Sequence, residues 1–480
     1  MGGQDREHDA GASYRYQAMT RELIARIEAG HYAEGERLPS VRALMRAHQV
    51  SMTTASRVLV ELESQGYAFS RERSGFFVQP RPPRTGTTPT TPTPTRTARP
   101  AVVSMNALVA SLFRAQAGEG QLSLGAAELA AELLPTRALT QAMIKVARAS
   151  GAEGILYGPA GGEPALRHQI ARWMGTRGVV VAPEEVWITE GESGAMGAAL
   201  RALTRPGDLV AVESPTYFGL LRWIEALGLQ AVEIATDPRL GVDVEELERV
   251  LETLPVAVIA VNPVFHNPFG GTVPPERMQA LIRLAARHRV PVIEDDVYGA
   301  LSFDSHGVAP LRAHDEAGGV LYCSSFSKTV APGYRVGWCL PGRWAERLAL
   351  FPFGGAVLPQ RALAVFLAGR AHARHLEGLR ALFAGQASRI RALVLEAFPE
   401  GTRISDPRGG YVFWVEGPAS FDALGFHARA RAHGIGIAPG PLFSPTGRFA
   451  NAFRLSVGRP LTPGVEEAIR TLGRLARGGD

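Results

Sequence analysis

A run of residues near the N-terminus contains almost nothing that a folded core can use. Residues 81–100 (RPPRTGTTPTTPTPTRTARP) hold eight threonines, six prolines, four arginines and no acidic residue. This composition favours extended, polyproline-like conformations that bury little apolar surface. At about 3.1 Å per residue, the segment can span on the order of 60 Å. The sequence therefore predicts a linker between two domains, residues 1–80 and residues 101–480.

The rest of the composition is that of an ordinary globular protein. Of the 480 residues, 46% are hydrophobic and 20% are charged, and the formal net charge is +5. This mild positive charge permits nucleic-acid binding without demonstrating it. The sequence has neither a long apolar run nor a secretory pattern, so we expect a cytoplasmic protein with no membrane partner. Cys323 and Cys339 are too few for a disulfide framework or a metal site, and their apolar neighbours indicate buried thiols.

The first domain has the pattern of a winged helix-turn-helix. Apolar residues recur at helical spacing from Tyr16 to Ile27. Ser40 and Ser51 stand where each can cap a following helix, and YAFSRERSGFFV has two strand-like runs around a basic turn. In such a module the N-terminal residues of the third helix enter the major groove of DNA. We therefore expect contacts with bases and phosphates from Ser51, Thr53, Thr54 and Arg57.

Three segments of this domain, GERLPSVRAL, VSMTTASRVLVELESQGY and RSGFFV, resemble the GntR family of bacterial regulators over residues 14–78. The resemblance implies that Arg42 contacts phosphate and that Arg71 and Arg73, in the wing, contact phosphate or the minor groove. Met52 and Ser56 stand where the family often has arginine, so a base preference is not carried over. A module that serves only packing or dimerisation is the alternative.

Lysine is nearly absent from the chain, which makes each remaining lysine informative. Lys145 and Lys328 are the two lysines, and the other basic residues are arginines. An arginine can replace a surface lysine, but a guanidinium stays protonated and does not condense with an aldehyde. Lys145 lies in an amphipathic helical pattern and reads as a solvated charge. Lys328 is therefore the candidate for amine chemistry.

The second domain alternates strand-like runs with helical segments, which predicts an α/β fold with a mainly parallel sheet. The strand-like runs are EVWIT, LVAVE, VAVIAV, VPVIED and GVLYCSSF. Ligands bind at the carboxyl ends of the strands in such sheets. At one of these ends Lys328 lies near hydroxyls and a guanidinium that suit a phosphate beside a Schiff base: Ser325, Ser327 and Arg335.

Other strand ends offer the remaining groups of a pyridoxal 5'-phosphate site. Asp295 can keep a pyridine nitrogen protonated, and Tyr298 and Asn267 can hydrogen-bond a ring hydroxyl. The turn in VWITEGESGAM leads into a helix whose free N–H groups suit a phosphate. Tyr217 can stack on a ring. Each pattern alone is common, but the five strand ends together supply the set of groups that this cofactor needs.

These strand ends resemble fold-type I pyridoxal phosphate enzymes, the aspartate aminotransferase group, over nearly all of residues 101–480. The resemblance implies that the cofactor forms a Schiff base with Lys328, that Asp295 binds its pyridine nitrogen, and that Asn267 and Tyr298 bind its phenolic oxygen. It also implies that Tyr217 stacks on the ring. The phosphate would be held by Ser325, Ser327, Arg335 and the backbone of Glu192 and Ser193.

Two further segments extend this resemblance. YGPAGGEPALR implies that Tyr157 reaches the phosphate of a neighbouring subunit, and hence a homodimer. NAFRLSVG implies that Arg454 grips the α-carboxylate of an amino acid. Glu190 and Glu192 flank a turn that should bind a dianion, where inward carboxylates would be repelled. We therefore expect both side chains to face away from the site.

A GntR-like reader, a linker and an aminotransferase-like domain together resemble the MocR subgroup of bacterial transcription regulators. The resemblance implies binding to double-stranded operator DNA that changes with pyridoxal phosphate, a small amino compound or both, in a homodimer that is commonly head-to-tail. One alternative is an active aminotransferase with an accessory or autoregulatory DNA-binding domain. Another is a degenerate scaffold that binds no cofactor.

Overall fold

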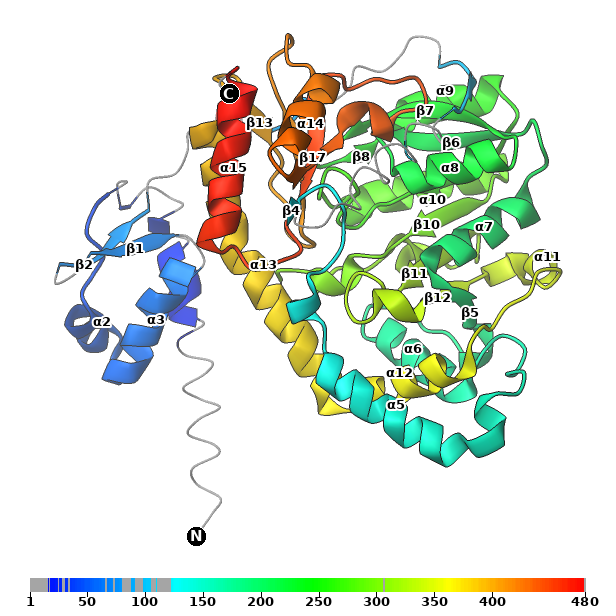
Figure 1. Cartoon of the computed structure of the whole chain (residues 1–480), viewed down its shortest axis with the longest axis horizontal. Coiled ribbons are helices and arrows are strands. Elements are labelled where there is room, and N and C mark those ends of the chain that lie inside the picture. Colours follow the sequence, from blue (N-terminus) through cyan, green and yellow to red (C-terminus); the bar gives the residue numbers. More distant parts are fainter. Residues whose placement is uncertain are drawn as a thin grey trace. The chain divides into compact units, whose positions relative to one another are not determined.

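The computed structural model describes residues 16, 18–24, 26–27, 31–32, 35–64, 67–71, 74–79, 88–90, 98–104, 109, 122–304 and 307–478. The chain divides into two compact units, one of residues 1–86 and 384–396 and one of residues 87–383 and 397–480 (Figure 1). Most of the linker and one DNA-contact candidate, Arg73, lie outside the described residues.

The small unit contains the helices that the sequence predicts. Residues 18–24 and 26–27 are helical, and α2 (Val41–His48) and α3 (Met52–Ser64) follow. The Ser40 hydroxyl accepts a hydrogen bond from the Ala43 N–H at 3.2 Å, and the Ser51 hydroxyl accepts one from the Thr54 N–H at 3.2 Å. Both predicted caps are therefore confirmed, because each hydroxyl satisfies a backbone donor that has no partner within the helix.

A hairpin completes this unit. Strands β1 (Ala68–Arg71) and β2 (Gly75–Val78) pair in antiparallel register, as the sequence predicts for the wing. The core below them is made of apolar side chains from the helices and the hairpin, including Leu23, Leu44, Leu59, Leu62 and Val78. A winged helix-turn-helix order of helices and hairpin is thus present around one small core.

The large unit is built on a sheet of nine strands in the order β3-β7-β6-β9-β10-β11-β12-β5, with β8 paired to β7 (Figure 1). Neighbours from β7 to β11 are parallel, whereas β12 is antiparallel to both β11 and β5. The bounds are β3 (Ala101–Val102), β5 (Trp187–Glu190), β6 (Leu209–Ser214), β7 (Gln230–Asp237), β8 (Gly241–Val242), β9 (Val256–Val261), β10 (Val292–Asp295), β11 (Val320–Ser325) and β12 (Val336–Leu340). The predicted mainly parallel sheet is confirmed, and the antiparallel strand β12 makes it mixed.

Helices pack on this sheet and beside it (Figure 1). Helix α7 packs against β5, β11 and β12, and α12 packs against α5 and α6. Their bounds are α5 (Thr136–Ser150), α6 (Pro164–Gly175), α7 (Gly191–Leu203), α8 (Phe218–Ala226), α9 (Val244–Thr253), α10 (Pro275–His288), α11 (Ala345–Leu348) and α12 (Val357–Ala368). Helix α13 (Arg370–Ala397) follows in the chain, and its residues 384–396 belong to the other compact unit. Within the described ranges, no helix is both long and apolar enough to span a bilayer.

A second, smaller sheet follows in the chain and was not anticipated from the sequence. It has the antiparallel order β13-β14-β17-β16, and a further short pair joins β15 to β4. The bounds are β4 (Leu122–Ser123), β13 (Arg403–Ile404), β14 (Val412–Glu416), β15 (Ile435–Gly436), β16 (Ala438–Pro439) and β17 (Ala452–Ser456), with helices α14 (Ala423–Ala432) and α15 (Pro463–Ala476). This sheet matters for the site because it carries Arg454.

The core of the large sheet includes both cysteines. Cys323 on β11 and Cys339 on β12 are register partners, free and fully buried, which confirms the predicted buried thiols. Next to them, Gly337 on β12 lets the first residue of α7 approach the sheet. A Cβ at Gly337 would lie 2.4 Å from the Gly191 carbonyl carbon and 2.6 Å from the Ser324 carbonyl oxygen. Backbone atoms cannot move aside as a flexible side chain can.

We expect Gly337→Ala to lower the free energy of unfolding by about 2 kcal/mol, because the added methyl group overpacks backbone on both sides. Gly333→Ala is the matched control, since a Cβ there meets nothing within 4 Å. Chemical denaturation followed by circular dichroism measures both variants. Equal losses for the two variants would show that the close packing at Gly337 is not what limits this position.

Candidate functional site

The ends of five strands meet at one edge of the large sheet. Strands β6, β9, β10 and β11 run parallel, and β5 shares their direction because both β5 and β11 are antiparallel to β12. Their carboxyl ends therefore lie along the same edge, as expected for a ligand site in such a sheet. The predicted site residues come from these ends and from the segments that directly follow them.

Lys328 lies just after β11 and is half-buried. Its Nζ donates a hydrogen bond to the Ala127 carbonyl oxygen at 2.7 Å. Burial, and then repulsion from the Arg454 guanidinium, lowers the pKa of Lys328, although Glu128 and Glu192 act in the opposite direction. A lowered pKa leaves more of the amine neutral and therefore nucleophilic.

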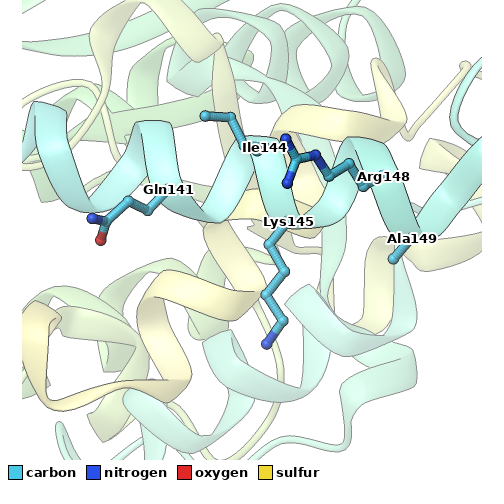
Figure 2. A pocket seen from close by; sticks show the side chains of 5 residues that line it. All are labelled: Gln141, Ile144, Lys145, Arg148 and Ala149. Atoms are coloured by element: carbon cyan, nitrogen blue, oxygen red, sulfur yellow. The ribbon is translucent and has the colours of Figure 1, made fainter.

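The other lysine has a different environment. Lys145 is exposed on α5, where it lines an open recess together with Gln141, Ile144, Arg148 and Ala149. Figure 2 shows Lys145 and Arg148 projecting from the helix. The carboxylates that surround Lys328 have no counterpart among the residues that line this recess. The contrast supports the assignment of amine chemistry to Lys328.

Asp295 and Tyr298 present polar atoms that are buried without a partner. Within the described part of the chain, neither Asp295 Oδ1 nor the Tyr298 hydroxyl has a hydrogen-bond partner. Burial, followed by repulsion from Glu192, raises the pKa of Asp295 well above its usual range, and burial also raises the pKa of Tyr298. Unpaired buried groups of this kind are costly. A protonated pyridine nitrogen at Asp295 would supply the missing hydrogen bond and a counter-charge.

A buried ionic network anchors the chain immediately beyond Asp295. The Arg177 guanidinium bonds the Asp296 carboxylate, which also accepts hydrogen bonds from the Tyr322 hydroxyl at 2.9 Å and the Gly299 N–H at 3.0 Å. The Ser324 hydroxyl donates to the Asp296 carbonyl oxygen at 2.6 Å. These contacts of Asp296 fix the backbone next to Asp295. The Asp295 carboxyl is therefore positioned without taking part in the network itself.

Asn267 and Arg454 meet directly although they are far apart in sequence. Arg454 Nη1 donates to Asn267 Oδ1 at 2.7 Å, and Arg454 Nη2 donates to the Gly125 carbonyl oxygen at 2.5 Å. Arg454 is 1% exposed, and its Nε has no partner among the described residues. Since the Asn267 oxygen is occupied, its amide N–H groups are the part of the side chain that can face a ligand oxygen.

Tyr217 directly precedes α8, and its ring packs beside Phe218 with centroids 4.9 Å apart. Burial, and then the neighbouring Glu192 carboxyl, raises the pKa of its hydroxyl. The ring needs Gly219, because a Cβ there would lie 2.3 Å from a Tyr217 ring carbon. Sequence reasoning missed Gly219, and the glycine two residues after the aromatic residue was the available signal.

The turn between β5 and α7 faces the predicted phosphate ligands. Arg335 Nη1 donates to the Ser327 hydroxyl and Nη2 to the Glu190 carbonyl oxygen, both at 3.5 Å. The Ser325 hydroxyl accepts from the Ser327 N–H at 3.3 Å. Gly191 has φ +73°, and a Cβ there would lie 2.6 Å from Arg335 Nη2. These contacts bring a guanidinium, hydroxyls and a helix N-terminus together, a set that suits a phosphate.

The expectation that both glutamates of this turn face away holds for one and is wrong for the other. Glu190 is exposed, whereas Glu192 is half-buried and its carboxyl interacts with Lys328, Arg335, Asp295 and Tyr217. Burial outweighs the two cations and raises the pKa of Glu192 to about 7. Ser193, the next residue, is half-buried in the first turn of α7. The Glu192 carboxyl therefore lies inward, among the predicted cofactor ligands.

Tyr157 is not brought to this cluster within one chain. It is fully exposed in the loop before α6, and its neighbours Ile155 and Leu156 are exposed as well. Among the described residues, His, Cys, Asp and Glu side chains do not gather in groups of three or more suited to a metal ion.

The described DNA-contact candidates of the small unit lie on α2, at the N-terminus of α3 and along it, and on strand β1. Arg42, Ser51 and Thr53 are exposed. Two arginines are held against aromatic rings: the Arg57 guanidinium lies 4.3 Å from the Tyr16 ring centroid, and that of Arg71 lies 4.8 Å from the Phe77 ring and 5.2 Å from the Phe69 ring. The Ser51 and Thr54 hydroxyls are 2.9 Å apart. Stacking of this kind restricts a long side chain before it meets DNA.

The inward carboxyl of Glu192 makes a testable contribution to stability. Its pKa is raised in the folded protein, so the unfolded chain releases the proton first, and stability falls as the pH rises from about 4.5 to about 7. We expect Glu192→Gln to remove about 2 kcal/mol of this loss in the cofactor-free protein, less than the full shift because the residue is half-buried. Glu190→Gln is the exposed control. The free energy of unfolding is measured at pH 5 and pH 8 for each protein. If it changes by the same amount in wild type and in Glu192→Gln, the inward placement of Glu192 is contradicted.

Models of two protein families match this chain. "Aminotransferase class I and II" matches residues 119–472, and "Bacterial regulatory proteins, gntR family" matches residues 15–78. Similarity to the crystal structure of LysN, an alpha-aminoadipate aminotransferase of Thermus thermophilus complexed with N-(5'-phosphopyridoxyl)-L-leucine, covers 77% of this chain and 94% of that chain. The TM-score is 0.70 at 28% sequence identity.

One relative matches nearly the whole chain, and another matches about three quarters of it. The HTH-type transcriptional regulator YjiR of Escherichia coli, itself described as uncharacterized, is 34% identical over 96% of this chain and 98% of its own length. The 2-aminoadipate transaminase of Thermus thermophilus is 30% identical over 75% of this chain and 91% of its own length. The chain therefore belongs to the aminotransferase class I and II family and, with its gntR-type N-terminal domain, to the MocR subgroup of GntR-family transcription regulators.

Proposed function

We propose that this protein is a DNA-binding transcription regulator whose large domain, residues 101–480, binds pyridoxal 5'-phosphate and senses the cofactor, an amino compound or both. The observation that carries the proposal is that Lys328, whose pKa is lowered, lies close enough to the Asp295 carboxyl to interact with it electrostatically. Oδ1 of this buried carboxyl has no partner among the described residues, and the same chain has a winged helix-turn-helix. Full-length similarity to HTH-type regulators supports the same function. The boundaries that we propose for the other parts are residues 1–80 and the linker 81–100.

Each residue of the proposed site has a defined task. Pyridoxal phosphate supplies an aldehyde for condensation with amines and a ring that withdraws electrons. Lys328 would offer its amine to the cofactor, and Asp295 would hold the proton on the ring nitrogen. Asn267 and Tyr298 would donate hydrogen bonds to the ring oxygen, and Tyr217 would stack on the ring. Ser325, Ser327, Arg335 and the backbone of Glu192 and Ser193 would hold the phosphate.

The proposed effector carries both an amine and a carboxylate. Two nitrogens of the Arg454 guanidinium donate hydrogen bonds to protein oxygens. Its third nitrogen, the buried Nε, has no partner in the described structure. Burial lowers the pKa of Arg454, and the negative charge of a carboxylate in front of the guanidinium would offset this effect. An amino acid bound there would present its amine toward Lys328, because Arg454 bonds Asn267 beside the strand ends and its charge acts on Lys328.

A second copy of the chain is expected to complete the site. Tyr157 is fully exposed beside exposed Ile155 and Leu156, an apolar group that a partner surface would cover. We propose a homodimer in which Tyr157 reaches the phosphate of the partner site, in a head-to-tail arrangement.

In the small domain we propose that Arg42, Ser51, Thr53, Thr54, Arg57, Arg71 and Arg73 bind double-stranded operator DNA. Most of these side chains are exposed, and two of the arginines are preorganised on aromatic rings. Such a module reads bases from the third helix and fixes its register through phosphates.

An active aminotransferase with an accessory or autoregulatory DNA-binding domain is the second candidate. The observation that supports it is that the residue types needed for transamination occur at the strand ends around Lys328, whose lowered pKa would suit both cofactor binding and proton transfer. The transaminase of Thermus thermophilus, 30% identical over 75% of this chain, points in the same direction. Rapid turnover of an amino donor with an oxo acid would make this the primary activity.

The regulator function is tested by DNA binding with and without ligand at fixed salt. We expect wild type to bind DNA from its own upstream region, with an affinity that changes about fivefold or more on adding pyridoxal phosphate and amino acids. Lys328→Arg keeps the charge but should lose both the visible absorbance of the bound cofactor and the ligand response. Lys145→Arg, the other lysine, is the control and should retain both. A protein with no sequence-selective DNA binding under any ligand condition is not a regulator of this kind.

The shared site is tested by mixing subunits that carry different substitutions. We expect Tyr157→Phe to weaken pyridoxal phosphate binding about tenfold, because a hydrogen bond to the phosphate is lost. Mixed dimers of Tyr157→Phe and Lys328→Arg should contain one normal site for each two chains, and absorbance titration measures this. If the tyrosine served its own chain, no normal site would form in the mixture.

A further inference from the structure

Two groups that hold opposite parts of the proposed ring come from different segments of the chain. Asp295 ends β10, whereas Asn267 lies in the loop that follows β9. A planar aromatic ring fixes the separation between its nitrogen and its phenolic oxygen. The two protein groups therefore have to be held at a matching separation, to within a fraction of an ångström.

A single buried carboxamide connects these two segments. Asn262 follows β9 and is 4% exposed. Its Nδ2 donates a hydrogen bond to the Asp295 carbonyl oxygen, and its Oδ1 accepts one from the Asn267 N–H at 2.5 Å. Both ends of one rigid, planar amide are thus used, one on each segment.

Asn262 is itself fixed from a third strand. Its backbone N–H donates to Glu213 Oε2 on β6 at 2.7 Å, and the same oxygen lies 3.2 Å from His266 Nε2. The Phe269 N–H donates to His266 Nδ1 at 3.3 Å, which places the imidazole proton on Nε2, facing Glu213. Glu213 and His266 are both buried, so this support lies inside the protein and not at its surface.

We propose that Asn262 is a positioning residue of the cofactor site, whose carboxamide sets the spacing between Asp295 and Asn267. Only a side chain with a donor and an acceptor on one short planar group satisfies both partners. An aspartate has no donor for the Asp295 carbonyl, and a leucine of similar volume satisfies neither. The residue acts through backbone atoms and does not touch the cofactor.

This inference rests on the proposed cofactor function and is tested in the full-length protein with pyridoxal phosphate. We expect Asn262→Ala to weaken cofactor binding about tenfold, as judged by absorbance titration, since two hydrogen bonds that preorganise the site are lost. We also expect the pH midpoint of the visible absorbance of the bound cofactor to rise by about one unit. A displaced Asp295 would hold the ring-nitrogen proton less firmly, and the Lys328 nitrogen in the loaded site would then keep its own proton to higher pH. A purely structural residue would not move this midpoint.

Two further variants protect the test from misfolding and from general loss of stability. Asn262→Ser keeps a polar group but cannot reach both partners, and it should shift affinity and midpoint in the same direction. Gln360→Ala is the matched control, because Gln360 is also a buried carboxamide with both ends engaged, on the Glu163 N–H and on the Gly354 and Ala356 carbonyl oxygens. It should lower the melting temperature without changing the absorbance midpoint.

The possible results separate the inference from the proposed function. A wild-type protein that binds no pyridoxal phosphate overturns both. Normal cofactor binding by wild type, with affinity and midpoint unchanged in Asn262→Ala and Asn262→Ser, overturns the role of Asn262 alone. A midpoint shift in Gln360→Ala as large as that in Asn262→Ala also overturns it, because loss of any buried amide would then suffice.

Discussion

The carboxyl group of Asp295 is buried at the end of a central strand without a hydrogen-bond partner for Oδ1 among the described residues, and much of the large domain is arranged around it. Isolated buried acids are costly, so a folded protein keeps one only where the surroundings fix it in place. Here Asp296 is tied to Arg177 and Tyr322, and Asn262 holds the Asp295 carbonyl oxygen. The cost is incurred in the cofactor-free protein, and under the proposed function a protonated ring nitrogen would offset it.

The same electrostatic logic extends to the other side of the site. Lys328 and Arg335 face Glu192, a carboxyl that partly neutralises them in the absence of a phosphate. An incoming dianion would have to share these cations with Glu192, so cofactor binding and the protonation of Glu192 are linked.

Local signals in the sequence were sufficient for much of the fold. Ser40 and Ser51 cap helices as predicted, and the strands around Asp295 and Lys328 form where apolar runs predict them. These features depend on neighbours within a few residues, so a single sequence contains the information. The smaller sheet was missed because several of its strands are only two residues long, as at Arg403–Ile404, and are defined by their partners.

The sequence by itself determined the two kinds of domain, the strand ends that bear the site and the lysine suited to amine chemistry. Parallel strands place their carboxyl ends at the same edge of a sheet regardless of the loops that connect them. The sequence alone could therefore assign the residues that follow these strands to one edge. Only the tertiary structure decided the inward direction of Glu192, the pairing of Arg454 with Asn267, the exposure of Tyr157 and the bridge made by Asn262. These depend on how one element is rotated or packed against another, and such long-range geometry leaves no regular spacing in the chain.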